Sequence, residues 1–509
     1  MVVSAFIQST RAWLAKFGLD VPDIRIEGLT LDSREVNTRV AFLAVKGHER
    51  DGREFIPQAI SLGARVVVAQ TDDRSQHGAL EMRGNTVIIA FYELQYVLSS
   101  LAAAFYDYPA NKMSTIAVTG TNGKTSVVQL VTQLKALLGT RSAAIGTLGS
   151  GVYEGPQTEW VQSPAANTTP DAINFQCLLA EFVQQQVQQV AFEASSHALV
   201  QGRLHQVNTD IAVFTNLSRD HLDYHQTMEE YAKAKRGLLR QPGLRTVVVN
   251  GDDLESQNWL AEAPETMNKV WVSCQGAPAT LPECRHCLAT KVAYHEGGCE
   301  FYLQSSWGAS VVKIPLLGAF NVSNVLLAVA ALLAQGERFD DLVRVLPAIQ
   351  PVPGRMEVFE FTSNANIVVD YAHTPDALEK ALHAARLHTG AEVWCVFGCG
   401  GDRDKGKRPL MGKAAELGAD HVIVTTDNSR SEAPDAIAAD ILAGMKEPQL
   451  AFCEPDRESA IRYCLDKAAG HDLIVVAGKG HEDYQIIGNT KTDYNERALV
   501  ARLQQEYSI

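Results

Sequence analysis

Two patterns of hydrophobic and polar positions alternate along the chain. Short apolar runs bounded by turn residues predict buried strands. Between them, apolar residues spaced three and four apart predict amphipathic helices. This alternation indicates α/β units, with parallel strands joined by crossover helices. The predicted strands span residues 41–45, 64–69, 86–90, 115–118, 190–192, 211–214, 246–249, 367–369, 393–397, 421–424 and 473–476.

These units fall into three groups, which predict three domains. Residues 1–108 form a small N-terminal α/β domain, and residues 109–350 form a central domain with a parallel sheet of the P-loop ATPase type. A proline-bearing turn at 350–354 leads into a C-terminal Rossmann-like domain, residues 351–509. A chain of 509 residues has room for about three such cores.

Composition and charge narrow the class of protein. Hydrophobic residues at 46% and charged residues at 20% are typical of a soluble globular protein. The net charge of -14 argues against non-specific binding to nucleic acid or anionic membranes, because both need a basic surface. The sequence has no apolar run long enough to span a membrane and no secretory signal at its start, so we expect a cytoplasmic protein. Nine cysteines, an odd number, fit reduced thiols in that compartment.

One cysteine segment leaves two alternatives open. Two residues separate Cys284 from Cys287, and His295 and Cys299 lie downstream. The spacing admits a zinc knuckle but falls short of a full zinc pattern. It favours free thiols on a surface excursion, and the surrounding insert, residues 262–300, receives no functional assignment.

A glycine-rich loop follows one strand of the central domain. The backbone N–H groups of Gly120 to Gly123 can face a polyphosphate, and Lys124 can reach its outer phosphates. The Thr125 hydroxyl is placed to hold Mg²⁺. Val118 stands where the usual P-loop has a glycine, so this loop is a shortened form. A tight turn with an exposed lysine is the alternative, but the strand before the loop and the amphipathic helix after it favour a phosphate site.

Two further polar clusters follow predicted strands of the same domain. Glu193 is a candidate Mg²⁺ ligand, although a solvated turn acid has the same pattern. Residues 215–225 are dense in groups that bind metal or phosphate. Within them, His221 and His225 have the spacing of a zinc protease helix, but Leu222 replaces the glutamate that serves as its base. A hard cation at an ATP site therefore fits better than zinc hydrolysis.

Two segments carry basic residues whose role the pattern alone leaves open. Lys233 and Lys235 lie on a predicted helix, where the pattern indicates a solvated charged face. The turn 398–403 resembles a dinucleotide-binding fingerprint, but Arg403 takes the place of the last glycine. A basic residue there suits a ligand carboxylate better than close helix packing, so the turn favours an anionic ligand over NAD.

Together these motifs resemble those of the Mur ligase family, and within it the ligases that add the third residue of the peptidoglycan stem peptide. The matching segments run in order through all three predicted domains, which argues against chance. They are residues 120–125, 167–170, 193–197, 215–223, 234–235, 320–324, 354–355, 370–374, 398–403 and 478–482.

The resemblance implies an ATP- and Mg²⁺-dependent ligase. The catalytic residues it implies are Lys124, Glu193, His221 and Lys235. In the family a lysine at the position of Lys235 is carbamylated, as N6-carboxylysine, which turns a cation into a carboxylate-like ligand. The implied metal ligands are Thr125, Glu193, His221 and this carbamate, and the implied ATP site consists of Gly120, Thr121, Asn122, Gly123, Lys124, Thr125, Ser126, Asn324, Arg355 and Asp370.

The resemblance also implies two organic substrates. UDP-N-acetylmuramoyl-L-alanyl-D-glutamate would contact Leu31, Ser33, His48, Glu49, Arg50, Asn167, Thr168, Thr169, Ser195, Gln201 and Arg203. The incoming amino acid would contact Arg403, Asp427, Asn428, Ser429, Arg430, Gly478 and Glu482.

The segment 427–430 bears on which amino acid is added. Family members that add meso-diaminopimelate carry Asp-Asn-Pro-Arg, and this chain has Asp-Asn-Ser-Arg. Arg430 is retained, and a guanidinium pairs with a carboxylate in a bidentate manner, which favours diaminopimelate over lysine. Ser429 replaces the proline and could loosen the loop.

The expected reaction is ATP-dependent amide formation through an acyl phosphate, by a monomer that binds neither nucleic acid nor membrane. The alternatives within the fold are a lysine-adding ligase, which Arg430 opposes, and a folylpolyglutamate synthetase, which segments 167–170 and 427–430 oppose. An alternative of another class is a nucleotide-binding protein without ligase activity.

Overall fold

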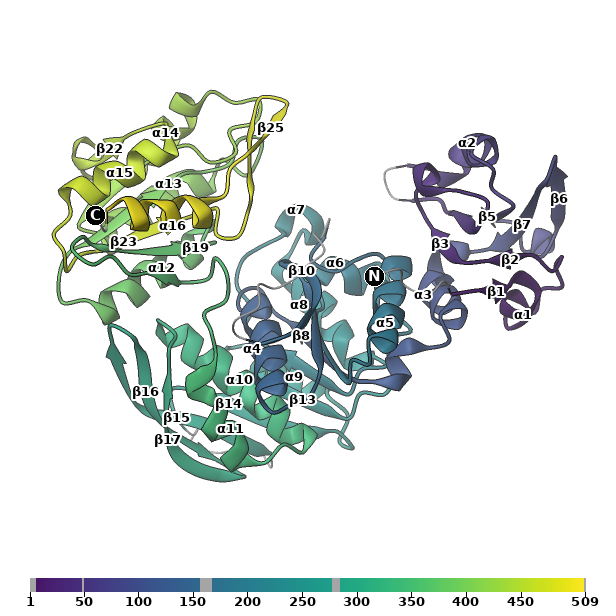
Figure 1. The fold of residues 1–509 in the computed structure, drawn as a ribbon, viewed down its shortest axis with the longest axis horizontal. Coiled ribbons are helices and arrows are strands. Elements are labelled where there is room, and N and C mark those ends of the chain that lie inside the picture. Colours follow the sequence, from purple (N-terminus) through teal and green to yellow (C-terminus); the bar gives the residue numbers. More distant parts are fainter. Residues whose placement is uncertain (1–5, 48–49, 156–166, 277–283, 508–509) are drawn as a thin grey trace. The chain divides into compact units, whose positions relative to one another are not determined.

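The computed structural model describes residues 6–47, 50–155, 167–276 and 284–507. The chain forms two compact units, residues 1–249 with 253–270, and residues 250–252 with 271–509. Figure 1 labels the helices and strands of both units. Among the described residues, no helix combines the length and apolar character that crossing a membrane requires.

The N-terminal part of the first unit is a five-stranded sheet. Its strand order is β3-β4-β5-β7-β6, and all neighbours are parallel except the β6–β7 pair. Alternate residues enter two cores, because side chains of a strand point to opposite faces. Val66 and Val68 pack with α3 on one face, while Val67 packs with α2 on the other. The bounds are β1 Gln8–Ser9, α1 Thr10–Ala15, β2 Arg25–Ile26, β3 Gly28–Thr30, β4 Val40–Ala44, α2 Ile56–Ser61, β5 Val66–Thr71, β6 Leu80–Arg83, β7 Thr86–Tyr92 and α3 Leu94–Phe105.

The rest of the first unit is built on strands in the order β10-β9-β11-β8-β12-β13. Strands β9, β11, β8, β12 and β13 are parallel, and β10 pairs antiparallel with β9 at the edge. The chain leaves β8 to one side for β9 and β11 and to the other for β12 and β13, so the loop after β8 lies at the reversal of strand order, where open α/β sheets bind ligands. The bounds are β8 Ser114–Thr119, α4 Lys124–Leu137, β9 Ser142–Gly146, β10 Gly149–Tyr153, α5 Ala172–Gln184, β11 Gln189–Glu193, α6 Ser196–Val200, β12 Ile211–Phe214, α7 Leu222–His225, α8 Met228–Arg236, β13 Thr246–Asn250 and α9 Ser256–Glu262.

The second unit begins with an antiparallel extension that the sequence pattern did not predict. Strands β15 (Arg285–His295), β16 (Gly298–Ser305) and β17 (Gly308–Ile314) pair in chain order after β14 (Asn268–Ser273), and β15 lies against α10 (Ala319–Gln335), which precedes α11 (Phe339–Val345). Cys287 and Cys299 are buried on β15 and β16, so the expected surface excursion is wrong at these two thiols. Burial raises the pKa of Cys287 to about 12, which makes it an inert core residue.

The C-terminal part of the second unit is a six-stranded sheet in the order β18-β19-β23-β20-β21-β22. Its pairs are parallel except that of β18 with β19. Helices α12, α13 and α14 bury one face, while α15 and α16 bury the other (Figure 1). This confirms the Rossmann-like prediction. The bounds are β18 Glu357–Phe359, β19 Asn366–Asp370, α12 Pro375–His388, β20 Val393–Phe397, α13 Lys407–Gly418, β21 His421–Val424, α14 Pro434–Leu442, β22 Phe452–Cys453, α15 Arg457–Lys467, β23 Leu473–Ala477, β24 Tyr484–Ile487, β25 Thr490–Asp493 and α16 Glu496–Glu506.

Candidate active site

The glycine loop after β8 has the backbone conformation and the close packing that require glycine. Gly120 has φ +144° and Gly123, which caps α4, has φ +85°. A Cβ atom at Gly120 would overlap the hydroxyl of Thr215. The loop therefore lies directly against the segment that follows β12.

Thr215 and Asn216 hold this loop in place. The backbone N–H groups of Thr121 and Asn122 donate to the main-chain and side-chain oxygens of Asn216, at 2.8 and 2.9 Å. The Thr215 hydroxyl donates to the Asn122 carbonyl at 2.6 Å. The first two residues of the predicted polar segment 215–225 thus fix the shape of the loop.

Two lysines donate to the same loop carbonyl. Lys124 Nζ lies 2.9 Å and Lys235 Nζ lies 2.6 Å from the oxygen of Gly120. Lys235 is only 1% exposed and lies 4.2 Å above the centre of the Tyr231 ring, so the solvated-face interpretation is wrong for this lysine. Burial, followed by the charge of Lys124, holds the pKa of Lys235 well below its usual value.

Glu193 is a buried carboxylate at the end of β11. It is 1% exposed, which excludes a solvated turn acid. Its Oε1 accepts from the Thr125 hydroxyl at 2.9 Å and from the Thr147 N–H at 2.8 Å, and its Oε2 accepts from the Thr147 hydroxyl at 3.2 Å. The structure therefore brings together Thr125 and Glu193, two predicted metal ligands, and adds Thr147, which the sequence did not indicate.

His221 lies outside a helix. It precedes α7 as its N-cap with φ +53°, so His221 and His225 do not share one helical face as in a zinc protease. The His221 ring lies 5.0 Å from that of His197 and 6.1 Å from that of Tyr231. Burial lowers the pKa of His221 and, with the charges of the neighbouring histidines, lowers that of His197 to about 4. In the described part of the chain, no three His, Cys, Asp or Glu side chains are grouped as ligands for a metal ion.

The residues predicted to bind the muramyl peptide form one network beside Glu193. The Thr169 hydroxyl donates to the Glu193 carbonyl at 2.6 Å and accepts from the Ser195 N–H at 3.1 Å. Arg203 donates to the Thr169 carbonyl at 2.6 Å and to the Gln201 side chain at 2.6 and 2.9 Å. Thr168 lies 3.2 Å from Thr147, hydroxyl to hydroxyl, and Asn167 is exposed nearby in the chain.

The residues predicted to bind the UDP end are less closely joined. Ser33 is buried and donates to the Gln58 side chain at 2.9 Å, and Leu31 packs partly buried on the N-terminal core. Arg50 is exposed. His48 and Glu49 lie outside the described residues.

In the second unit, Arg355 and Asp370 lie close together. The Asp370 carboxylate accepts the N–H groups of Met356 and Ala372, each at 2.8 Å, so it fixes the backbone beside Arg355. The Arg355 guanidinium lies 4.3 Å from the centre of the Tyr371 ring. Burial raises the pKa of Asp370, against the opposing effect of Arg355.

Asn324 lies on α10 in the same unit. Its amide donates to Asn321 Oδ1 at 3.1 Å, and the amide of Asn321 donates to the Leu317 carbonyl at 2.8 Å.

The predicted amino-acid pocket also lies in the second unit, where two turns meet. A Cβ atom at Gly401 would overlap the Ser429 carbonyl, and the Gly401 N–H donates to the Asn428 carbonyl at 2.8 Å. Arg430, in the left-handed region at φ +49°, donates to the Gly401 carbonyl at 2.9 Å. The glycines of the turn 398–403 thus allow close approach of two main chains.

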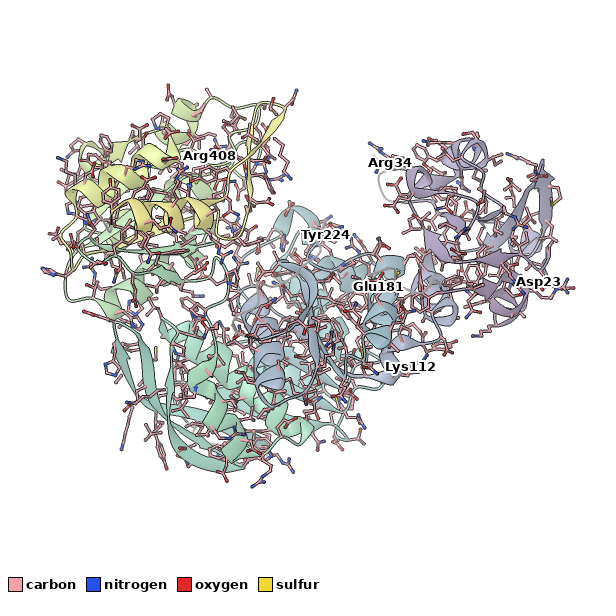
Figure 2. The ribbon with its side chains drawn as sticks, in the orientation of Figure 1. Asp23, Arg34, Lys112, Glu181, Tyr224 and Arg408 are labelled. Carbon is pink, nitrogen blue, oxygen red and sulfur yellow. The ribbon has the colours of Figure 1, made fainter. Side chains whose placement is uncertain are left out.

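Arg408 (labelled in Figure 2) holds this turn through a hydrogen bond to its main chain. It is fully buried, donates to the Gly400 carbonyl at 3.2 Å and makes a bidentate pair with Glu432 at 2.8 and 3.0 Å. Glu432 in turn accepts the Asp402 N–H at 2.7 Å. Arg403 follows on the exposed side of the turn.

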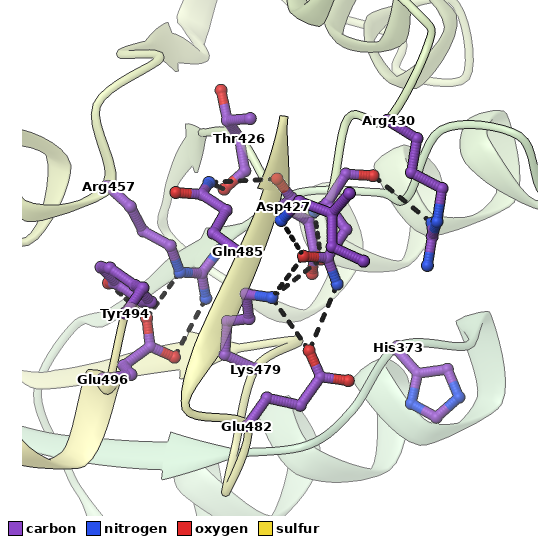
Figure 3. A network of polar contacts seen from close by, with 12 residues as sticks. His373, Thr426, Asp427, Arg430, Arg457, Lys479, Glu482, Gln485, Tyr494 and Glu496 are labelled. Carbon is purple, nitrogen blue, oxygen red and sulfur yellow. Dashed lines mark hydrogen bonds and ion pairs between the residues drawn. The ribbon is translucent and has the colours of Figure 1, made fainter. Parts of the chain in front are cut away.

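A buried polar network surrounds Asp427 and Glu482 (Figure 3). Lys479 Nζ donates to Asn428 Oδ1 and to Glu482 Oε2, both at 2.9 Å. Burial raises the pKa of Asp427, but the charges of Lys479 and Arg457 outweigh it and leave this pKa below its usual value. Gly478, with φ +113°, comes so close that a Cβ atom there would lie 2.8 Å from Asp427 Oδ2.

Three segments of the chain match descriptions of Mur ligases. Residues 25–106 match "Mur ligase family, catalytic domain", residues 118–332 "Mur ligase middle domain", and residues 354–480 "Mur ligase, glutamate ligase domain". A UDP-N-acetylmuramoyl-L-alanyl-D-glutamate--2,6-diaminopimelate ligase of Haemophilus influenzae is 43% identical over 94% of this chain and 96% of its own length. The chain belongs to the Mur ligase family.

Solved Mur ligase structures agree with the fold. A structure of a UDP-N-acetylmuramoyl-L-alanyl-D-glutamate--2,6-diaminopimelate ligase has a TM-score of 0.69 and 33% identity, and the alignment covers 98% of this chain and 99% of that one. The MurF ligase of Thermotoga maritima in complex with ADP has a TM-score of 0.63 at 17% identity over 94% and 96% of the two chains. The α/β fold with three Mur ligase domains is therefore confirmed, whereas the boundaries 1–108, 109–350 and 351–509 remain a prediction.

Thr147 and Lys479 belong to this Mur ligase site, but the sequence did not single them out. Thr147 follows β9 and contacts Glu193, so its role depends on tertiary structure. Thr215 and Asn216 lie in the predicted segment 215–225, and only the structure shows that they hold the phosphate loop. Lys479 could have been found, because it stands between two glycines directly after a buried strand.

Proposed function

We propose that this protein is the ATP-dependent ligase that joins meso-diaminopimelate to the D-glutamyl γ-carboxylate of UDP-N-acetylmuramoyl-L-alanyl-D-glutamate. The observation that carries the proposal is 43% identity, over 94% of the chain, to a ligase of that name. The retained Arg430, placed beside the glycine turn, supports diaminopimelate over lysine, because its planar guanidinium suits the second carboxylate.

The phosphate loop would bind ATP through the backbone of residues 120–126 and through Lys124. In the second unit, Asn324, Arg355 and Asp370 would bind the nucleotide. Arg355 is already ordered by its contact with Tyr371 and by the Asp370 cap.

The oxygens of Thr125 and Glu193 fit Mg²⁺, because this cation prefers hard oxygen ligands and combines few protein groups with substrate phosphates. His221 and a carbamate on Lys235 would complete the metal environment. When bound, Mg²⁺ would neutralise phosphate charge.

The position of Lys235 supports its carbamylation, in addition to the resemblance to the family. It is buried beside the loop, 2.6 Å from the Gly120 carbonyl. Incorporation of ¹³C-bicarbonate, followed by ¹³C NMR, is expected to give a carbamate signal that Lys235→Met removes. An equal signal in both proteins would contradict this assignment.

The reaction would proceed in two displacements. A γ-carboxylate oxygen of the D-glutamyl residue attacks the γ-phosphorus of ATP, the bond from that phosphorus to the bridging oxygen breaks, and ADP leaves. Lys124 stabilises the developing charge. The diaminopimelate amine then attacks the acyl carbon, loses its proton, and expels phosphate from the tetrahedral intermediate.

The substrates would occupy the two networks described above. Leu31, Ser33, His48, Glu49 and Arg50 would bind the UDP end. The muramyl peptide would contact Asn167, Thr168, Thr169, Ser195, Gln201 and Arg203. Diaminopimelate would contact Arg403, residues 427–430, Gly478 and Glu482.

We further propose that the ligase works as a cytoplasmic monomer, apart from membranes and nucleic acids. The net charge of -14 supports a monomer that does not bind anionic membranes or nucleic acids.

Phosphate release in the presence of ATP, Mg²⁺, the UDP-muramyl dipeptide and meso-diaminopimelate tests the proposed reaction. Steady release is expected only when both organic substrates are present, and ATP binding without turnover would support a nucleotide-binding protein instead. Lys235→Met is expected to abolish turnover. Its matched control is Lys233→Met on the same helix, where the side chain is 67% exposed and turnover should be unchanged.

A further inference from the structure

Lys479 is a fully buried lysine in a position that its backbone dictates. It follows β23 and stands between Gly478 (φ +113°) and Gly480 (φ +52°). A Cβ atom at Gly480 would lie 2.7 Å from the Cβ atom of Tyr371, so the backbone packs closely against the residue that follows β19. The Lys479 side chain therefore points into the network of Figure 3 from a rigid support.

The charges of this network do not cancel. Lys479 Nζ lies 2.9 Å from Glu482 Oε2 and 3.6 Å from Asp427 Oδ1, so one ammonium faces two carboxylates. Arg457, a buried guanidinium whose charge also acts on Asp427, is already paired with Glu496 at 2.5 Å. The two carboxylates that face Lys479 thus carry one more negative charge than its ammonium balances, and a ligand ammonium would supply the missing positive charge. Arg430 is a separate positive charge of the same pocket.

Lys479 also determines which carboxylate oxygen faces a ligand. Glu482 Oε2 accepts from Lys479 and, at 3.2 Å, from the Asn428 amide. Within the described part of the chain, Glu482 Oε1 accepts a long hydrogen bond of 3.5 Å from the Tyr371 hydroxyl and no shorter one. Asn428 is oriented in the same way, because its Oδ1 accepts from Lys479 and from the Ile486 N–H at 2.8 Å.

We propose that Lys479 is a positioning residue for the incoming amino acid, which holds Glu482 Oε2 and the Asn428 amide so that Glu482 Oε1 receives a substrate ammonium. Lys479 also leaves one carboxylate charge for the substrate ammonium, while Arg430 is a cation for the substrate carboxylate, and together they match an amino acid whose far end carries both groups. This inference rests on the proposed function.

Steady-state kinetics of Lys479→Met and Lys479→Arg test the role. In Lys479→Met, the KM for diaminopimelate is expected to rise about ten- to a hundredfold, the range for a lost hydrogen bond to a charged group. The KM values for ATP and the UDP-muramyl dipeptide should stay near those of the unaltered enzyme. The preference for diaminopimelate over L-lysine should fall, because two uncompensated carboxylates favour the more cationic acceptor. Lys479→Arg keeps the charge and should retain that preference.

Lys491→Met is the matched control. Lys491 lies over the same Tyr484 ring as Lys479, at 4.0 Å against 5.3 Å, but on the exposed strand β25. Its removal should leave all three KM values unchanged. A fall in kcat for Lys479→Met without a selective rise in the KM for diaminopimelate would overturn the inference. So would a Lys479→Met enzyme whose preference for diaminopimelate over L-lysine is unchanged.

Two outcomes separate this inference from the function on which it rests. If the unaltered protein shows no acceptor-dependent turnover, the proposed function fails. If the unaltered protein turns over and Lys479→Met behaves like Lys491→Met, only the role of Lys479 fails. Should Lys479→Met not fold, Lys479→Arg decides, because a displaced donor must still raise the KM for diaminopimelate severalfold while a merely structural lysine would not.

Discussion

Replacing Arg457 by methionine should destabilise the C-terminal sheet domain by several kcal/mol. Arg457 begins α15, and its side chain is 1% exposed against 0% for Glu496 on α16. The guanidinium bonds both oxygens of Glu496, at 2.5 and 3.1 Å, and the Ala477 carbonyl at 2.7 Å. It therefore ties two helices to the end of β23, immediately before Gly478.

The magnitude follows from the carboxylate left behind. Removing one partner of a buried ion pair costs about 3–5 kcal/mol, because the other charge stays buried without compensation. Methionine has a similar length, so the cavity contribution is small. Glu496 also accepts a hydrogen bond from the Tyr494 hydroxyl at 3.1 Å, but this neutral donor cannot replace a guanidinium.

Hydrogen exchange in peptides from α15 and α16 measures this local free energy, independently of the first unit. Arg457→Met/Glu496→Gln should recover part of the loss, because no buried charge remains. Arg502→Met is the control, since Arg502 pairs with Glu458 between the same helices at 2.7 Å but is 55% exposed, and its loss should cost less than about 1 kcal/mol. A cost for Arg457→Met no larger than that for Arg502→Met would contradict the role of the buried pair.

Three further predictions concern single groups of the site. Ser429 Oγ is buried without a hydrogen-bond partner among the described residues, so Ser429→Ala should keep or raise the free energy of unfolding, by up to about 1 kcal/mol; a clear loss in a denaturant titration would contradict this. Burial and the nearby charges of Arg355 and Arg497 lower the pKa of His481 to about 3, below its unfolded value of about 6.5. The unfolded state therefore binds the extra proton, and stability is lost as pH falls from about 6.5 towards 3. His481→Gln should reduce this loss by up to about 1.4 kcal/mol per pH unit, which urea midpoints at pH 7 and pH 5 would measure. An equal loss of stability in the variant and the unaltered protein would contradict this prediction. Thr125→Val removes the hydroxyl that contacts Glu193 Oε1, so the Mg²⁺ concentration for half-maximal rate should rise about 10- to 100-fold in a titration, and an unchanged midpoint would remove Thr125 from the metal site.

The sequence predicted the parallel strands well because they are short, apolar and bounded by turn residues. Residues 211–214 and 393–397, for example, coincide with β12 and β20. The phosphate loop was predictable for a related reason, since its glycines, lysine and threonine are adjacent in the chain and its function depends on local backbone conformation.

The remaining features depend on contacts between distant segments. Lys235 reads as a solvated charge, and only packing of α8 against the phosphate loop buries it. Strand β15 is hard to predict because it contains a register shift between Thr290 and Ala293, which breaks the simple alternation of buried and exposed positions. The position of Lys479 between two glycines is visible in the sequence, but its hydrogen bond to Asn428 depends on the folded position of segment 427–430.

Diaminopimelate is the amino acid that we propose this Mur ligase adds to UDP-N-acetylmuramoyl-L-alanyl-D-glutamate. One competition experiment tests it most directly: the enzyme receives ATP, Mg²⁺ and UDP-N-acetylmuramoyl-L-alanyl-D-glutamate with equal concentrations of meso-diaminopimelate and L-lysine, and mass spectrometry identifies the UDP-linked product. The diaminopimelate product is expected to predominate. A predominant lysine product would keep the ligase reaction but contradict the role assigned to Arg430, and the absence of both products, with the ATP intact, would contradict the proposed function itself.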